Sequence, residues 1–376
     1  MKKCSIILIL FFLVIINTQA QKIIENPEKS LSKNAERVLE VIEELRIADN
    51  GKDMQSLGNM LKIQPPQGAI ELELVYFIPT KEQEEKDQYF WKPFKIVSDP
   101  VGNIFVVDYS NTVFKYDSTL KFIKKFGQTG QGPGDLSMPQ LTVSFNDSII
   151  IAEAGNMRLQ YFDFDGNSRK IVKLLRWYFS FDISNDDLIF GTPHLRKENE
   201  SHFIEVLSPE GKRINSFGNL LDYKHDRNLL NRAFIFLNSK DEILVSFVHF
   251  PIVRKYSQKG ALIREYHIET EMMVEKEKYN KKMYSLRPQD RTPFIQAVHC
   301  AREYGDHLFM LDYVPPRIYI MEMNEEGKLE NTYFATVGEK YVAIDIMPKK
   351  EKNRMMFYVL QRNPEVKAHL FSPKQH

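Results

Sequence analysis

Short apolar segments recur along the chain in groups of four, with a period of about 40 to 50 residues, which is typical of propellers. Each group reads as a strand, a turn carrying Asp, Asn or Gly, an apolar strand, an aromatic-rich strand, a Gly or Ser turn and a last strand. The copies occupy residues 94–126, 141–174, 178–217, 233–266 and 294–334. A two-layer β-sandwich does not predict such a unit with repeated turn chemistry. The pattern therefore indicates an all-β propeller.

The last copy has only three strands, at residues 341–346, 354–360 and 366–371. Residues 70–77 form an isolated strand ahead of the first copy, and their early part alternates apolar and acidic positions as an exposed outer strand does. If this strand pairs beside residues 366–371, the ring closes and an exposed sheet edge is removed. We therefore predict a six-bladed β-propeller of four-stranded antiparallel blades, closed by an N-terminal strand.

The N-terminus has the pattern of a secretory signal peptide, residues 1–20. Lys2 and Lys3 precede an apolar run at residues 6–16, and small residues precede a cleavage point before Gln21. The run is shorter than the roughly 20 residues of a membrane-spanning helix. Cys4 precedes the run instead of following it, which argues against a lipoprotein. We predict a soluble exported protein, periplasmic or extracellular.

The remaining chain divides into residues 21–67, an arm or linker, and residues 68–376, the propeller. Within the arm, apolar positions at helical spacing in residues 32–47 predict either a short helix packed on the propeller or a partly loose arm, which Pro65 and Pro66 separate from the closing strand. Two insertions, residues 219–232 and 269–293, each join an outer strand to the next inner strand. Either a lid over the channel mouth or a solvated surface helix with an apolar seam fits them.

The net charge and the cysteine content exclude some classes of partner and cross-link. Loss of Lys2 and Lys3 with the signal peptide takes the formal charge from +1 to −1, so nothing basic favours nucleic acid. Cys300 is then the one cysteine left, which excludes an intramolecular disulfide and predicts a buried thiol.

The glycine-rich segment FGQTGQGPGDLSMP at residues 126–139, with the strands of residues 149–163, resembles the NHL repeat. It is similar to secreted six-bladed propellers of the NHL and TolB-like type, although the motif is clear only in the first two blades. The resemblance implies that Arg158 belongs to the polar framework of the repeat, with ligand contact as the alternative. The glycines and Pro133 suit a sharp turn, and the Gly-Lys-Ser/Thr ending of a phosphate-binding loop is absent.

No histidine pair has the i, i+4 or H-E-x-x-H spacing of a helical metal site, but a propeller can assemble a site from several blades. The candidates lie near the ends of inner strands and in insertions. The ligand-binding candidates are Arg158, His194, His225, His249 and Arg317. The candidate metal ligands are Asp99, Asp182 and His299.

Three functions fit the sequence. We favour a non-catalytic binding propeller that recognises a protein, peptide or glycan at the mouth of the central channel, because no nucleophile elbow or Cys–His pair is evident. The first alternative is a metal-dependent lyase or hydrolase, which would hold Ca²⁺ or Zn²⁺ in the channel. The second is an assembly component of the cell envelope that uses residues 22–65 to engage a partner.

Overall fold

Each group of four predicted strands forms one antiparallel sheet in the computed structural model. The structure describes residues 72–371, with gaps at 195–199, 287–293, 299, 313–316, 325–326, 338–342, 352–353 and 362–364. The predicted signal peptide and helical arm, and the candidate His299, lie outside the described residues. The chain divides into a larger unit, residues 65–248, 252–266 and 298–376, and a smaller unit whose described part comes from His249–Pro251 and His267–Ala297.

The larger unit contains six described four-stranded sheets, which we number as blades in chain order. Blades one to three comprise β2 (Pro93–Ser98), β3 (Ile104–Asp108), β4 (Thr112–Tyr116) and β5 (Phe122–Phe126); β8 (Pro139–Phe145), β9 (Ser148–Glu153), β10 (Arg158–Asp163) and β11 (Ser168–Lys173); and β12 (Tyr178–Ile183), β13 (Ile189–Pro193), β14 (His202–Leu207) and β15 (Arg213–Asn219). Blades four to six comprise β16 (Ala233–Leu237), β17 (Ile243–Phe247), β18 (Ile252–Tyr256) and β19 (Leu262–His267); β20 (Cys300–Tyr304), β21 (His307–Asp312), β22 (Arg317–Met323) and β23 (Leu329–Thr336); and β24 (Ala343–Glu351), β25 (Arg354–Gln361), β26 (Glu365–Phe371) and β1 (Glu73–Ile78).

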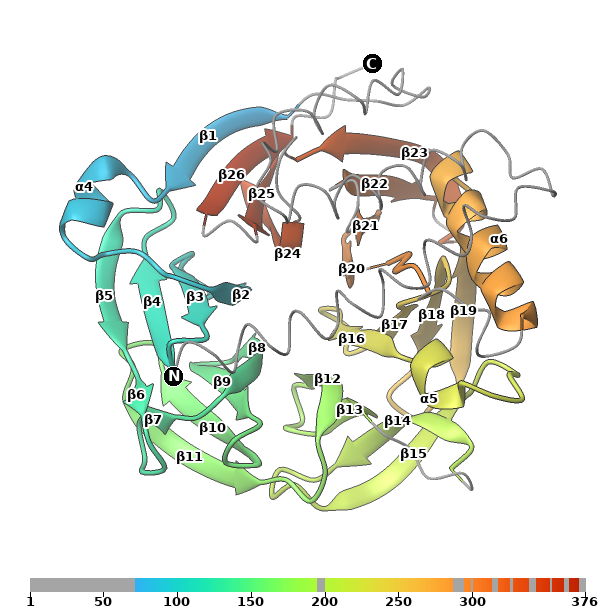
Figure 1. Cartoon of the computed structure of the whole chain (residues 1–376), viewed down its shortest axis with the longest axis horizontal. Helices are drawn as coiled ribbons and strands as arrows, with labels where there is room; N and C mark the ends of the chain where they lie inside the picture. Colours follow the sequence, from blue (N-terminus) through green and yellow to red (C-terminus); the bar gives the residue numbers. More distant parts are fainter. Residues whose placement is uncertain are drawn as a thin grey trace. The chain divides into compact units, whose positions relative to one another are not determined.

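The blades are arranged in a closed ring. The innermost strands β2, β8, β12, β16, β20 and β24 each contact the next in that order, and β24 contacts β2. Figure 1 shows these strands around the centre of the ring and the outer strands β5, β11, β15, β23 and β1 at its rim. The predicted six-bladed propeller is confirmed.

The ring is closed by the first strand of the chain. β1 pairs antiparallel with β26, with Glu73 opposite Leu370 and Ile78 opposite Val366. Ile78 is buried, whereas Leu74 on the same strand is exposed. The predicted closure is confirmed, and it gives the last blade its fourth strand.

The core consists of apolar side chains between adjacent sheets. One cluster joins blades six and one and contains Ile78, Ile96 and Tyr358, all of them buried. Corresponding clusters join blades one and two, two and three, and five and six. Full burial of such a side chain contributes roughly 1.5–3 kcal/mol, so packing between blades is a main source of stability.

Several connections carry short elements. α4 (Lys81–Glu85) begins with a capping box in which Thr80 and Gln83 satisfy each other's backbone N–H groups. The glycine-rich segment forms the short parallel pair β6 (Gln128–Thr129) and β7 (Asp135–Leu136), and the first insertion contains α5 (Arg227–Leu230). In the described part of the chain, no helix is long and apolar enough to cross a membrane.

The second insertion belongs to the smaller unit and forms α6 (Glu271–Ser285), which Thr270 caps. The buried Asn280 on α6 donates to the carbonyls of His249 and Ile295, at 2.6 and 2.7 Å, and accepts from the Ile295 N–H at 2.8 Å. These bonds explain one wrong prediction. The inner strand of blade five begins at Cys300 and not at residue 294, because the backbone of Ile295 is bonded to Asn280 instead of to a sheet.

Candidate functional site

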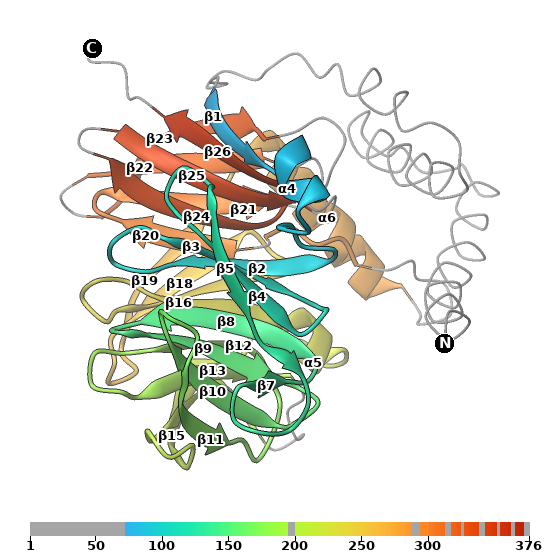
Figure 2. The same cartoon turned by 90° about the vertical axis from the view of Figure 1, so that its left-hand side faces the viewer.

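The strand pairing fixes which residues share one face of the ring. An innermost strand begins where the second strand of its blade ends, as in the facing pairs Pro93–Asp108, Ala233–Phe247 and Cys300–Leu311. The connections that carry α4, β6–β7 and α5 lie on this same side of the larger unit (Figure 2). We call it the entry face. Arg158 and Arg317, as the first residues of β10 and β22, and His194, directly after β13, all belong to it.

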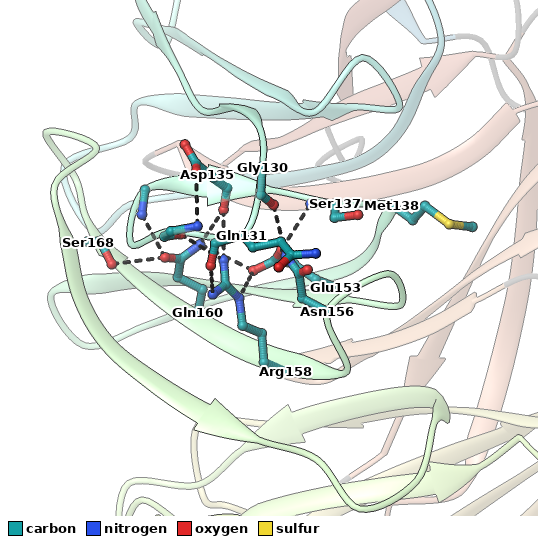
Figure 3. A network of polar contacts seen from close by, with 12 residues as sticks. Gly130, Gln131, Asp135, Ser137, Met138, Glu153, Asn156, Arg158, Gln160 and Ser168 are labelled. Carbon is teal, nitrogen blue, oxygen red and sulfur yellow. Dashed lines mark hydrogen bonds and ion pairs between the residues drawn. The ribbon is translucent and has the colours of Figure 1, made fainter.

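Arg158 lies at the centre of a polar network within blade two (Figure 3). Its Nε donates to Glu153 Oε1 at 2.7 Å, and both side chains are buried. Its two terminal nitrogens donate to the backbone carbonyls of Gln131, Gly132 and Asp135, at 2.7, 3.0 and 3.1 Å. The three carbonyl bonds fix the glycine-rich loop onto β10, and the bond to Glu153 joins β10 to β9. All four partners of Arg158 belong to blade two and to the loop that leads into it.

Three backbone carbonyl oxygens of the glycine-rich loop therefore point at the guanidinium of Arg158. A phosphate-binding loop does the opposite and directs N–H groups at an anion. Two of its N–H groups are already used, because Gly132 donates to Asp135 and Gly134 donates to Gln160. The local geometry supports a turn that joins blades.

Asp99 and Asp182 both bond to neighbouring groups of the fold. Asp99 accepts from the backbone and the side-chain amide of Asn103, at 2.7 and 2.6 Å, which orders the turn after β2. Asp182 accepts from the Ile183 N–H at 2.9 Å and, across the blade boundary, from the Leu237 N–H on β16 at 2.8 Å. Among the described residues, no group of three or more His, Cys, Asp or Glu side chains could hold a metal ion.

Asp182 also lies close to the positive charges of other blades. Burial raises the pKa of its carboxyl to about 6, although its two N–H bonds and the charges of Arg302 and Lys95 act in the opposite direction. Arg302 lies with its guanidinium 4.7 Å from the ring centre of Phe236. Residues of blades one, three and five thus act on one another electrostatically.

The remaining predicted ligand-binding residues do not form one cluster. The His225 Nε2 lies 4.0 Å from Asp226 within the first insertion. His249 belongs to the smaller unit, where its Nδ1 lies 3.2 Å from the Ile295 carbonyl and must donate to it. Arg317 is buried and lies over the ring of Phe334 at 4.9 Å.

His194 has a neighbour that the sequence did not indicate. Burial and the charge of Arg232 lower the pKa of His194. Arg232 immediately precedes β16, and its guanidinium lies 5.7 Å from the ring centre of Phe179 on β12. Phe179 in turn packs on Phe234 at 5.0 Å. A cation and two aromatic rings therefore meet at the boundary of blades three and four, and no repeat or spacing in the sequence marked this position.

Five exposed apolar side chains also lie on the entry face, in the connections of blades one to three. They are Trp91, Tyr109, Met138, Met157 and Leu175. Trp91 is 73% exposed and Leu175 is 89% exposed. Lys92 lies with its ammonium 5.2 Å from the ring centre of Tyr109. We call these five residues the apolar patch. The sequence did not indicate them, because single apolar residues in turns form no periodic pattern.

The ring of four-stranded sheets and its polar turn network define a six-bladed β-propeller. Residues 84–373 match the family DUF5128, described as a 6-bladed beta-propeller, and the chain belongs to this family. A comparison with curated proteins finds no match.

Two solved structures show the same fold. A protein of Bacteroides fragilis described as exported has a TM-score of 0.56 and 11% identity, over 81% of this chain and 95% of its own. A member of the DUF4221 family from Bacteroides vulgatus has a TM-score of 0.52 and 11% identity, over 80% of this chain and 98% of its own. At this identity the likeness concerns the fold.

Proposed function

We propose that the chain is an exported, non-catalytic propeller that binds a protein or peptide through its entry face. The apolar patch is the observation that carries the proposal. Large exposed apolar side chains that gather on one side of a folded protein are typical of interaction surfaces. The patch lies on the entry face, which also carries the connections between consecutive blades.

The composition of the patch favours a peptide over a glycan. Aromatic residues and methionine are enriched in protein interfaces, and methionine adapts its shape to different apolar partners. The patch contains the flexible apolar side chains of Met138, Met157 and Leu175 as well as the aromatic rings of Trp91 and Tyr109. Export is supported by the N-terminal pattern of residues 1–20, in agreement with the description of the Bacteroides fragilis protein.

The neighbours of the predicted metal ligands support a non-catalytic role. Asp99 and Asp182 both accept hydrogen bonds from the fold itself, so their oxygens stabilise a turn and a blade boundary. Arg158 is likewise committed to Glu153 and to the loop carbonyls. The polar atoms of these three side chains therefore make hydrogen bonds that stabilise the propeller itself.

The test is selection of binding peptides from a random displayed library on the chain that begins at Gln21, followed by affinity measurement. The double variant Trp91→Ala/Leu175→Ser should weaken the selected peptides at least about tenfold, since buried aromatic anchors dominate such interfaces. The matched control is Ile214→Ser/Leu262→Ser, which changes two exposed apolar residues on the outer strands β15 and β19. Equal affinity of patch and control variants, or enrichment of glycans alone in a parallel array, would contradict the proposal.

A further inference from the structure

The guanidinium of Arg232 is a partly buried charge with no carboxylate beside it in the described part of the chain. Its Nε is inaccessible to solvent and, among the described residues, has no hydrogen-bond partner. Burial lowers the pKa of Arg232, and no described acid acts against this shift. Its contact with the ring of Phe179 is a cation–π interaction, which is weaker than an ion pair with a carboxylate in the same environment.

Two other arginines, one over an aromatic ring and one between blades two and three, have acidic partners. Arg254 lies 5.2 Å from the ring centre of Phe247, and its Nε donates to Glu265 at 2.6 Å. Arg176 donates to Glu200 and Glu205 at 2.8 and 3.0 Å. Desolvating a charge without a partner is costly. Arg232 therefore lowers the stability of the free protein, and a bound anion would offset that cost.

The surroundings of Arg232 place it where a ligand can reach it. It lies at the start of an innermost strand, on the entry face, beside His194. Leu175 of the apolar patch lies in the connection that leads into β12, the strand that carries Phe179. A ligand on the patch would thus extend toward Arg232 along one strand of the ring.

We propose that Arg232, with His194 beside it, binds a carboxylate of the peptide or protein ligand. This inference rests on the proposed peptide-binding function and specifies its ligand as one that carries an acidic residue next to apolar ones. The planar guanidinium can hold a carboxylate through two parallel N–H bonds, and a ring stacked on its face leaves those edge N–H groups free. The imidazole of His194 offers a further donor.

The direct test uses glutarate as the probe and its diamide as the neutral control, by calorimetric titration of the mature chain. Wild-type protein should bind glutarate and not the diamide. Arg232→Met should weaken glutarate binding at least about tenfold and raise the Tm, because an uncompensated charge is replaced by an apolar side chain of similar length. Arg232→Lys keeps the positive charge but loses the planar guanidinium, so it should retain part of the affinity for glutarate.

Arg254→Met is the matched control, since Arg254 also lies over a ring but has Glu265 as its partner. It should leave glutarate binding unchanged and lower the Tm. If Arg232→Met binds glutarate like wild type, or if it lowers the Tm as Arg254→Met does, Arg232 is a structural residue and the inference is wrong.

A second arm separates this inference from the proposed function. Peptides selected on the entry face are resynthesised with each Glu or Asp replaced by its amide. If they bind through the patch and no replacement weakens them, the binding function stands and the carboxylate site fails. If glutarate binds through Arg232 and no peptide is selected, the anion site stands and the peptide-binding function fails.

Discussion

Arg158 and Glu153 face each other across β10 and β9, with the arginine Nε 2.7 Å from a carboxylate oxygen that is fully buried. Removing one member leaves the other charge buried without its partner, which costs about 3–5 kcal/mol. We expect Glu153→Ala to lower the free energy of unfolding in urea by that amount. Arg169→Ala breaks an exposed pair with Asp163 and should cost less than about 1 kcal/mol. Equal losses in the two variants would refute a dominant role for the buried pair.

Asp182 gives the stability a distinctive pH dependence. Its folded pKa, about 6, lies above the ordinary value for an aspartate, so the folded protein binds this proton more tightly than the unfolded chain. The contribution of Asp182 to stability is therefore greatest below pH 4 and is lost as the pH rises from 4 to 6, by about 1–3 kcal/mol. Asp163, whose pKa is lowered to about 2 by hydrogen bonds from Asn167 and Arg169, has the opposite sign. The measurement is urea unfolding from pH 4 to pH 7 for wild type and Asp182→Asn, whose difference isolates this carboxyl.

In that comparison, the stability of the wild type minus that of Asp182→Asn should fall with rising pH. A difference that is constant or rises with pH would show that the carboxyl is not destabilised by burial. The amide also loses one of the two acceptor oxygens used by Ile183 and Leu237, which lowers the stability of the variant at every pH without changing the slope.

Ile78 tests the closure of the ring. Its side chain is buried in the cluster between blades six and one, opposite Val366. Ile78→Ala should lower the free energy of unfolding by about 2–5 kcal/mol. Leu74→Ala, on the same strand but exposed, should change it by less than about 1 kcal/mol. If both substitutions are equally mild, the first strand contributes little to holding the ring closed.

The blades could be predicted because their chemistry repeats. Apolar strands and Asp-, Asn- or Gly-containing turns recur in the sequence. Because the last copy lacks one strand, the pairing of the first strand of the chain with the last blade could also be predicted. The start of blade five could not be predicted in this way. Residues 294–298 are apolar enough to resemble a strand, and only the fold brings Asn280 to the backbone of Ile295.

The candidate site was less predictable than the fold. Arg158 was marked by its place in a motif, and the structure shows it bonded to Glu153 and to the loop carbonyl of Gln131. Arg232 was not marked, because its interest lies in a desolvated charge with no acidic neighbour among the described residues. That property depends on which side chains converge in space, and a linear sequence with acids in every blade does not reveal it.

Asn280 should control the local stability of the smaller unit. Its amide makes three hydrogen bonds, two to carbonyls of His249 and Ile295 and one from the Ile295 N–H, while the side chain itself is inaccessible to solvent. Asn280→Leu removes these three bonds, and each backbone group left unsatisfied costs about 1–3 kcal/mol; the Ile295 carbonyl keeps the bond from His249 Nδ1. We expect faster amide hydrogen exchange throughout α6, with exchange in the blade strands β3 and β9 unchanged. Lys282→Leu, on the same helix, is the matched control and should leave exchange unaltered, because Lys282 is not among the buried residues of α6. Exchange that accelerates equally in α6 and in the blades would instead mean that Asn280 supports the fold as a whole.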